Sequence, residues 1–344
     1  MMKIGPIEKL ALFGGGPLMV AFAKEALKRG IQPTVFAVKR HLEEQLSNED
    51  GLCLEAALDV ASIPTVHARD VNVSPELQSL VSEKTMGIGL GETYRFDKET
   101  IARFQGRLFD FMVIRLPQYR GGAHFTWQIL REDKVGCWNI QVINDEMVPG
   151  VFDSGELIKT REYGIPSWAR IPKDYFQLAH EEGLKLFIEF MDEIQSDKTF
   201  APVPLNEANR SYFPRLSTIK QAFIDWSWHR DEIARFICAF DDPYPGASTF
   251  LGGQRVFLKR CQVAPVNFSS HPFLSGLVYR VSGPSALIAT RSGSIVVEGI
   301  LAENGKDLVP ELKAGQRFHT PVQYLEASMS YQASYDTEGL VNHD

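Results

Sequence analysis

The sequence predicts an α/β protein in which a parallel sheet flanked by helices is followed by a small antiparallel β-barrel. In the first 70 residues, short apolar runs typical of buried strands alternate with segments whose apolar residues recur at helical spacing. From residue 255 onward, four β-rich runs are separated by Gly, Ser and Pro turns. The length of 344 residues agrees with about two average domains.

The elements of the first part follow one another at short intervals. A helix expected after the first strand has Pro near its first turn and Gly just past its end, as helix boundaries usually do. Alternation of strands and helices at this spacing is typical of a parallel sheet with right-handed crossovers. In order, the sequence predicts a strand at 8–13, a tight turn at 14–17, a helix at 18–29, a strand at 33–38, a helix at 52–61 and a strand at 63–68.

The second half contains one long helix, a linker and the barrel strands. Residues 174–194 have an apolar stripe that includes Phe176, and we expect this stripe to pack into the core. Residues 199–214 are rich in Pro, Asn and other polar residues, which predicts a linker, whereas the polar stretch 326–344 is expected to be loose. A helix is expected at 231–240, and strands at 255–264, 275–281, 285–291 and 294–301.

Composition and charge exclude several classes of protein. Acidic residues outnumber basic ones 43 to 36, which argues against the broad basic face of a nucleic-acid binder. The four cysteines lie too far apart for a CxxC pair, and the histidines show no metal-ligand spacing, so no metal site is expected. No window approaches the apolar run of a membrane span or signal peptide. We therefore expect a soluble cytoplasmic protein without membrane contact.

The glycine triplet Gly14–Gly16 follows the first strand. A dinucleotide fingerprint would need glycine where Met19 stands, and the next strand ends at Val38 followed by Lys39 and Arg40, without the acidic residue that binds a ribose. A nicotinamide cofactor is therefore not expected. Two alternatives remain: the turn amides receive an anionic group, or the turn only reverses the chain sharply.

Several segments resemble the formyltransferase family, which includes methionyl-tRNA formyltransferases and sugar-nucleotide N-formyltransferases. LPQYRG at 116–121 is similar to the family's LLPxYRG turn, with Trp127 at the place of the tryptophan that follows it. VFDSGEL at 151–157 is similar to the GLDTGDIL loop. The matches occur in the family's order as far as about residue 262. Similarity to the start of the family's C-terminal region is found at 212–215, 224–227 and 240–247.

The resemblance implies a Rossmann-like formyltransferase domain at 1–205, a linker helix with an OB-like barrel at 206–330, and a flexible tail at 331–344. It also implies transfer of a formyl group from 10-formyltetrahydrofolate to an amine. We expect a small-molecule acceptor, a nucleotide-linked amino sugar, because the segments 225–227 and 242–247 look most like those of sugar formyltransferases. Residues 206–344 also carry nearly equal numbers of acids and bases, whereas a tRNA-binding barrel should show a basic face. Alternatives are a methionyl-tRNA formyltransferase and a catalytically silent binding protein. A homodimer is compatible with either enzyme.

The family's catalytic Asn, His and Asp carry over only in part. Asp153 matches the family's Asp, but the Asn position falls on Asp110 and the His position on Met112. An ionised Asp and a thioether donate no hydrogen bond, and removing one oxyanion donor typically costs about 2.7 to 4 kcal/mol. Either the site is rewired, with His124 as an imidazolium between Asp110 and Asp153, or it is silent.

Folate contacts are implied at two places. Gly89, Leu90 and Gly91 lie near the position of the family's VVAYG strand end, whose backbone lines the folate pocket. Arg120, next to Gly121, is expected to grip a carboxylate or phosphate. The alternatives are a glycine-rich turn without a ligand at 87–91, and an arginine that only caps its own turn.

Overall fold

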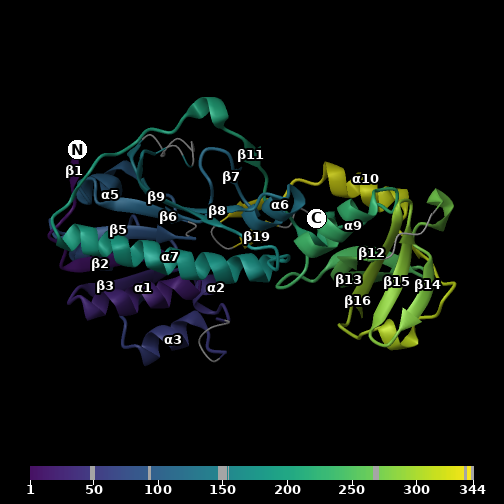
Figure 1. Cartoon of the computed structure of the whole chain (residues 1–344). Coiled ribbons are helices and arrows are strands. Elements are labelled where there is room, and N and C mark those ends of the chain that lie inside the picture. Colours follow the sequence, from purple (N-terminus) through teal and green to yellow (C-terminus); the bar gives the residue numbers. More distant parts are fainter. Residues whose placement is uncertain are drawn as a thin grey trace.

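The computed structural model describes residues 1–46, 51–91, 94–145, 153, 155–265, 271–336 and 339–341. A sheet with helices on both faces and a smaller β-barrel lie side by side, and helices α6 (His124–Leu130) and α9 (Arg230–Ala239) meet between them (Figure 1). This is the two-part α/β and barrel architecture that the sequence predicts.

A seven-stranded sheet forms the first part, in the order β4-β3-β2-β5-β6-β8-β9. The strands from β4 to β6 are parallel, whereas β8 and β9 run antiparallel to their neighbours. The parallel sheet expected from the alternation of strands and helices is thus extended at this edge by two antiparallel strands, β8 and β9, which follow each other without a crossover helix. The strands are β2 Lys9–Gly14, β3 Gln32–Ala37, β4 Thr65–His67, β5 Thr85–Leu90, β6 Leu108–Met112, β8 Val135–Val142 and β9 Leu157–Gly164.

Both faces of this sheet are buried because side chains of successive strand residues alternate between them. Leu10 and Leu12 of β2 belong to a core under α1 and α7, where the Phe22 and Phe187 rings stack at 4.0 Å. Phe13 belongs to a second core on the opposite face. The helices of this part are α1 Pro17–Lys28, α2 Lys39–Leu42, α3 Leu54–Val60, α4 Pro75–Leu80, α5 Lys98–Arg103, α6 His124–Leu130 and α7 Pro172–Gln195.

The second part is a six-stranded antiparallel sheet in the order β14-β15-β16-β13-β12-β17. Backbone hydrogen bonds from Gly276–Val278 to Gly315–Phe318 join its two edges, so the sheet closes into a small barrel. Its strands are β12 Ala247–Leu251, β13 Gln254–Val263, β14 Val278–Ser282, β15 Ser285–Thr290, β16 Gly293–Ala302 and β17 Phe318–His319. The accompanying helices are α8 Thr218–Gln221, α9 and α10 Val322–Ser330, with 3₁₀ turns at Glu207–Asn209, Pro272–Leu274 and Val309–Glu311.

The segment predicted as a linker is paired back onto the first part at two points. Strand β10 (Thr199–Phe200) pairs with β1 (Met2–Lys3), and β11 (Tyr212–Phe213) runs parallel to β7 (Arg120–Gly121). The tail, expected to be irregular, contains β18 (Ser334–Asp336) and β19 (Gly339–Val341), which pair with each other. Such local pairing needs no apolar alternation, so the sequence pattern does not reveal it.

Across the described part of the chain, no helix has both the length and the apolar character that a membrane crossing requires.

Candidate active site

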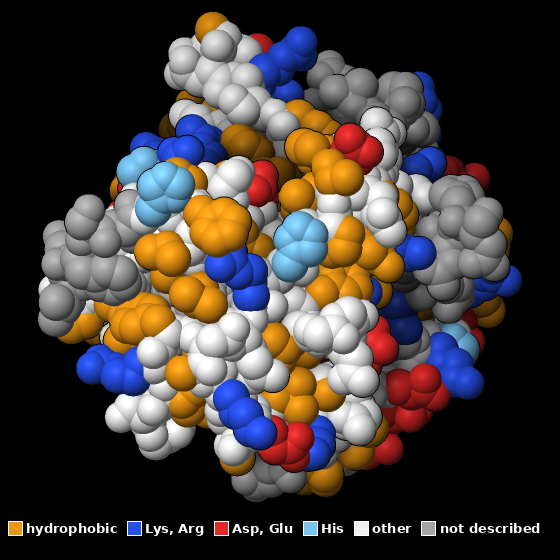
Figure 2. All heavy atoms as spheres, turned by 90° about the vertical axis from the view of Figure 1, so that its right-hand side faces the viewer, with side chains coloured by type: hydrophobic (Ala, Val, Ile, Leu, Met, Phe, Trp, Pro, Cys, Tyr) orange, Lys and Arg blue, Asp and Glu red, His pale blue; other side chains and the backbone are white. Residues whose placement is uncertain are grey.

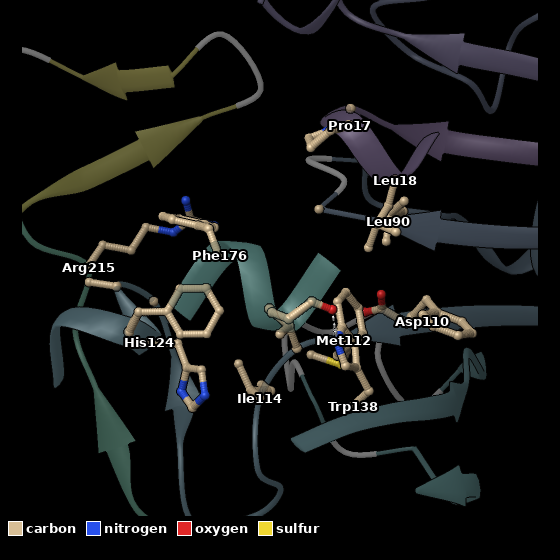
Figure 3. Close-up of a pocket in the computed structure, with 18 of the residues that line it drawn as sticks. Pro17, Leu18, Leu90, Asp110, Met112, Ile114, His124, Trp138, Phe176 and Arg215 are labelled. Atoms are coloured by element: carbon tan, nitrogen blue, oxygen red, sulfur yellow. Dashed lines mark hydrogen bonds between the residues drawn. The ribbon is translucent and has the colours of Figure 1, made fainter. Parts of the chain in front are cut away.

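A cavity of about 2390 Å³ lies at the carboxyl ends of the parallel strands and extends toward the linker (Figure 3). Ligand sites of open α/β sheets form at this edge because the loops after parallel strands converge there. Small-molecule pockets usually measure about 300 to 1000 Å³, so this cavity has room for two ligands at once. Strand β6, the turn at 120–125, helix α7 and the segment 212–215 all contribute lining residues.

Asp110 and Met112 both line the cavity from β6, two residues apart on the same face of the strand. Asp110 lies opposite Gly89 on one side and Gln141 on the other, and only 7% of its surface is exposed. The two positions that the sequence analysis matched to the family's Asn and His therefore do reach the cavity. What they bring to it is a carboxylate and a thioether.

Asp153 lines the same cavity from the loop before β9, in a left-handed backbone conformation with φ 58°. Burial raises the pKa of its carboxyl group, opposed by a hydrogen bond from the Gly121 backbone N–H and by the charges of Arg120 and Arg215. Because burial dominates, this carboxyl has a pKa above the usual range and is a stronger base than an exposed aspartate.

Arg120 fastens the Asp153 loop to the linker. Its Nε donates to the Asp153 carbonyl oxygen at 3.1 Å, and its two terminal nitrogens donate to the Glu207 carboxylate at 2.8 and 2.6 Å. A carboxylate of the chain itself thus already occupies the fork of Arg120. The contacts favour the turn-fixing alternative for Arg120 over a grip on a folate.

Gly121 is constrained from two sides. It adopts φ +109°, and an added Cβ would approach the Phe213 carbonyl oxygen to 2.0 Å, because β7 and β11 run side by side there. Its N–H points to Asp153, as described above. Gly121 lines the cavity, but its donor serves the carboxylate of Asp153.

His124, the first residue of α6, is buried, and both ring nitrogens have no hydrogen-bonding partner within the residues that the structure describes. Its ring meets the Tyr119 ring edge-on at 5.0 Å and points away from Asp110 in Figure 3. Burial lowers the pKa of His124 to about 3, against a weak opposing effect of Asp133. The expectation of an imidazolium between Asp110 and Asp153 is therefore wrong: this histidine is neutral.

Two of the three residues predicted to contact folate at 89–91 line the cavity. Leu90 and Gly91 line the cavity, whereas Gly89 sits inside β5 between Phe13 and Asp110 and is not among the lining residues. Residues 85–90 form the central strand of the sheet, which removes the alternative of a glycine-rich turn.

The glycine turn at 14–17 binds the carboxylate of a side chain, Glu44. The Gly16 backbone N–H donates to the Glu44 carboxylate, whose pKa is raised by burial. Gly15 donates its N–H to the Leu90 carbonyl oxygen. Both of the alternatives for this turn thus apply in part: it reverses the chain, and the anion that it receives is a side chain.

Four of the lining residues that were not singled out from the sequence as site residues come from α7 and the linker. Phe176 was expected in the core, but 46% of its surface is exposed and it lines the cavity from α7. Lys173 lies on the same face of α7, and Tyr212 and Arg215 come from the linker. Tyr212 and Arg215 belong to the segment 212–215, which is similar to the start of the family's C-terminal region. This similarity was the sequence signal that could have marked them as site residues.

Among the described residues, no cluster of three or more His, Cys, Asp or Glu side chains is arranged to hold a metal ion.

Comparison with known proteins gives the same assignment from two directions. Residues 217–316 match the C-terminal domain of the formyl transferases. A methionyl-tRNA formyltransferase of Methylacidiphilum infernorum is 31% identical over 195 residues, which cover 56% of this chain and 57% of that protein. Both matches support the formyltransferase superfamily. The matched regions cover between 57% and 63% of the length of three such methionyl-tRNA formyltransferases.

Solved structures share the fold of this chain. The N-formyltransferase from Helicobacter canadensis, in complex with folinic acid and dTDP-3-aminofucose, superimposes with a TM-score of 0.63 at 15% identity, covering 86% of this chain and all of that one. A 4-N formyltransferase from Francisella tularensis gives a TM-score of 0.57 at 14% identity, covering 74% and 98%. At such identities the likeness shows the fold alone.

Proposed function

We propose that the chain is a folate-dependent N-formyltransferase, with 10-formyltetrahydrofolate as the formyl donor and the amine of a nucleotide-linked amino sugar as the acceptor. The observation that carries this proposal is the position of Asp153. Its carboxyl group has a raised pKa and accepts a hydrogen bond from the Gly121 N–H. The Arg120 side chain holds its backbone carbonyl, and Asp153 lines a cavity large enough for two ligands.

Asp153 is the base of the proposed reaction. When the acceptor nitrogen bonds to the formyl carbon, it must lose a proton, and a carboxylate with a raised pKa takes up that proton more readily than an ordinary aspartate. Asp110, in its ionised form, accepts hydrogen bonds only, so its role is to orient the acceptor amine. His124 is neutral and has one N–H donor and one acceptor, and its participation stays a prediction.

The cavity walls fit a folate. Leu90, Gly91, Phe96, Phe111 and Ile143 are among the lining residues, so this end of the cavity is largely apolar, as a flat heterocycle requires. These residues would hold the donor, which when bound supplies an activated formyl group. The relative from Helicobacter canadensis, solved with folinic acid and an amino-sugar nucleotide, supports this choice of ligands.

Methionyl-tRNA is the second candidate acceptor, favoured by the sequence similarity to methionyl-tRNA formyltransferases. The charge on one face of the barrel argues against it. On the face of the barrel shown in Figure 2, Lys and Arg side chains are scattered among apolar ones and do not join into a basic patch. Binding of a tRNA needs such a patch to neutralise phosphates.

Incubation of the purified protein with 10-formyltetrahydrofolate and a panel of amino-sugar nucleotides tests the proposal, with folate absorbance and product mass as readouts. Asp153→Asn should lower turnover by about 10² to 10⁴-fold because it removes the base. Asp59→Asn, an exposed carboxylate on α3, is the matched control and should keep full turnover.

Two other outcomes would replace the proposal. Formylation of methionyl-tRNA, with binding that weakens steeply as salt rises, would establish the second candidate. Tight folate binding without turnover of any amine would show a silent binding protein, as the loss of both side-chain donors at positions 110 and 112 suggests.

A further inference from the structure

Gln141 is a fully buried side chain at the place where β8 meets the loop of Asp153. Its Nε2 donates a hydrogen bond of 2.7 Å to the Gly155 carbonyl oxygen. Gln141 also stands opposite Asp110 in the antiparallel pairing of β6 and β8, so the two side chains project from the same face of the sheet. Gln141 is therefore a neighbour of Asp110 across the strands and a direct contact of the loop that carries Asp153.

The side-chain amide of Gln141 is only half used. Its Oε1 is buried and has no hydrogen-bonding partner within the residues that the structure describes. A buried polar atom without a partner destabilises the folded state, and an apolar side chain of the same length would avoid that cost. The hydrogen bond to Gly155 is the one compensation for it in the described part of the chain, which indicates that this bond has a purpose beyond packing.

A β-bulge disrupts the pairing of β8 and β9 next to Gln141. The successive pairs are Ile140 with Lys159 and Gln141 with Leu157, so β9 contributes one residue more than β8 at this point. Bulges interrupt the backbone ladder and are frequent beside active sites, where they redirect a segment of the chain. The bond from Gln141 thus adds a side-chain contact where the backbone pairing is weakened.

The loop backbone is held at two places, two residues apart. Arg120 donates to the Asp153 carbonyl oxygen at 3.1 Å, and Gln141 donates to that of Gly155. Gly155 lies directly on β8, since an added Cβ would approach the Val142 carbonyl oxygen to 2.0 Å. Asp153 has φ 58°, and a residue other than glycine keeps this left-handed conformation only when its surroundings fix it.

We propose that Gln141 is a positioning residue for formyl transfer: by holding the Gly155 carbonyl, it keeps the Asp153 carboxyl group directed into the cavity. Gln141 is not among the residues that line the cavity, so it acts through the loop and not on a ligand. This inference rests on the proposed function for the reaction, but not for the holding of the loop.

Gln141→Met tests the role in the reaction, because it keeps the length of the side chain and removes the donor. The kcat for formyl transfer should fall about 10- to 100-fold, whereas KM for both substrates should stay nearly unchanged. A looser loop admits water to Asp153, whose pKa is raised by burial, so the acidic limb of the pH profile should move to lower pH. Gln141→Leu provides a second variant without a donor.

Gln128→Met is the matched control. Gln128 on α6 is also fully buried, its Nε2 donates to the Val135 carbonyl oxygen at 2.8 Å, and its Oε1 likewise has no partner among the described residues. The two substitutions therefore remove the same kind of hydrogen bond from the same kind of environment. Gln128→Met should keep the full kcat and the pH profile of the unchanged protein.

Hydrogen exchange followed by mass spectrometry tests the loop directly, without any substrate. The Leu157 N–H, just after the loop, donates to the Val203 carbonyl oxygen at 2.8 Å. Gln141→Met should speed up exchange in peptides that contain Glu156 and Leu157, and Gln128→Met should leave it unchanged.

An unchanged kcat in Gln141→Met, an equal loss of kcat in Gln128→Met, or unchanged exchange at the loop would each overturn the inference. Its failure is distinguishable from failure of the proposed function. Faster exchange confined to Gln141→Met, in a protein that formylates no amine, would sustain the holding of the loop and reject the enzyme. Formyl transfer that Gln141→Met leaves intact would sustain the enzyme and reject the positioning role.

Discussion

Arg120 and Glu207 form a two-bond ion pair, with N–O distances of 2.8 and 2.6 Å, that ties the linker to the loop of Asp153. The arginine is 11% exposed at its side chain and the carboxylate 51%. The pair thus joins a group next to the site to a residue far along the chain, and it engages the two terminal nitrogens of Arg120.

Glu207→Gln should lower kcat for formyl transfer about 10- to 100-fold. The substitution weakens the ion pair that fixes Arg120, which in turn holds the Asp153 backbone, and a displacement of a reacting group by about 1 Å can cost up to about 100-fold in rate. The free energy of unfolding should change by about 1 kcal/mol or less, as for other exposed ion pairs. Steady-state kinetics and denaturant unfolding give the two numbers. Glu311→Gln, which breaks the exposed ion pair with Lys306 on the barrel, is the control. An unchanged kcat in Glu207→Gln would contradict a positioning role.

Restoring the family's pattern at the altered positions should increase activity. The double variant Asp110→Asn, Met112→His returns two side-chain donors to the cavity, and one such donor typically contributes about a hundred- to thousandfold in rate. Burst and steady-state rates with 10-formyltetrahydrofolate measure the gain, with each single variant as the reference. If the double variant is no faster than the unchanged protein, the chain has replaced these donors by other groups.

Gly121→Ala should destabilise the protein and abolish transfer. The substitution forces a residue with a Cβ into φ +109° and against the Phe213 carbonyl, which separates β7 from β11. Such strain costs of the order of 2 to 4 kcal/mol, seen as a lower Tm in calorimetry. At Gly164, at the end of β9, an added Cβ would meet no atom within 4 Å, so Gly164→Ala should leave Tm nearly unchanged. Equal Tm values for the two variants would argue against the strand pairing.

Stability should fall as the pH drops below about 6.5. Burial lowers the pKa of His124 to about 3 and that of His41 to about 4 in the folded state, while both titrate near 6.5 when unfolded. Between these values the unfolded chain binds more protons, so each histidine costs about 1.4 kcal/mol per pH unit. Urea unfolding at pH 5 and 7 measures the difference.

His124→Leu removes one of these two groups and should reduce the loss of stability between pH 7 and 5 by about 2 kcal/mol. The same variant tests catalysis: since the ring packs against Tyr119, away from Asp110, transfer at pH 7 should fall less than in Asp153→Asn. A loss as large as that of Asp153→Asn would return His124 to the catalytic group.

Much of the fold was predictable because it depends on local patterns. The strand expected at 33–38 is found at Gln32–Ala37, and the helix expected at 174–194 at Pro172–Gln195, since apolar periodicity and Pro or Gly boundaries are written into adjacent residues. The antiparallel direction of β8 and β9 was missed because strand direction depends on the path between strands, which local pattern does not encode.

For the candidate site too, positions within motifs were predictable from the sequence, whereas charges and contacts were not. Motif spacing in the sequence alone predicted that Asp153 stands at the family's Asp and that Asp110 and Met112 replace two donors. The tertiary structure decided the charge of His124, since a pKa depends on burial and on neighbours distant in the chain. It also decided that Arg120 is bound to Glu207 and that Phe176 faces a cavity. A helical stripe specifies which side chains share a face, whereas only the packing of α7, the turn at 120–125 and the linker determines what that face meets.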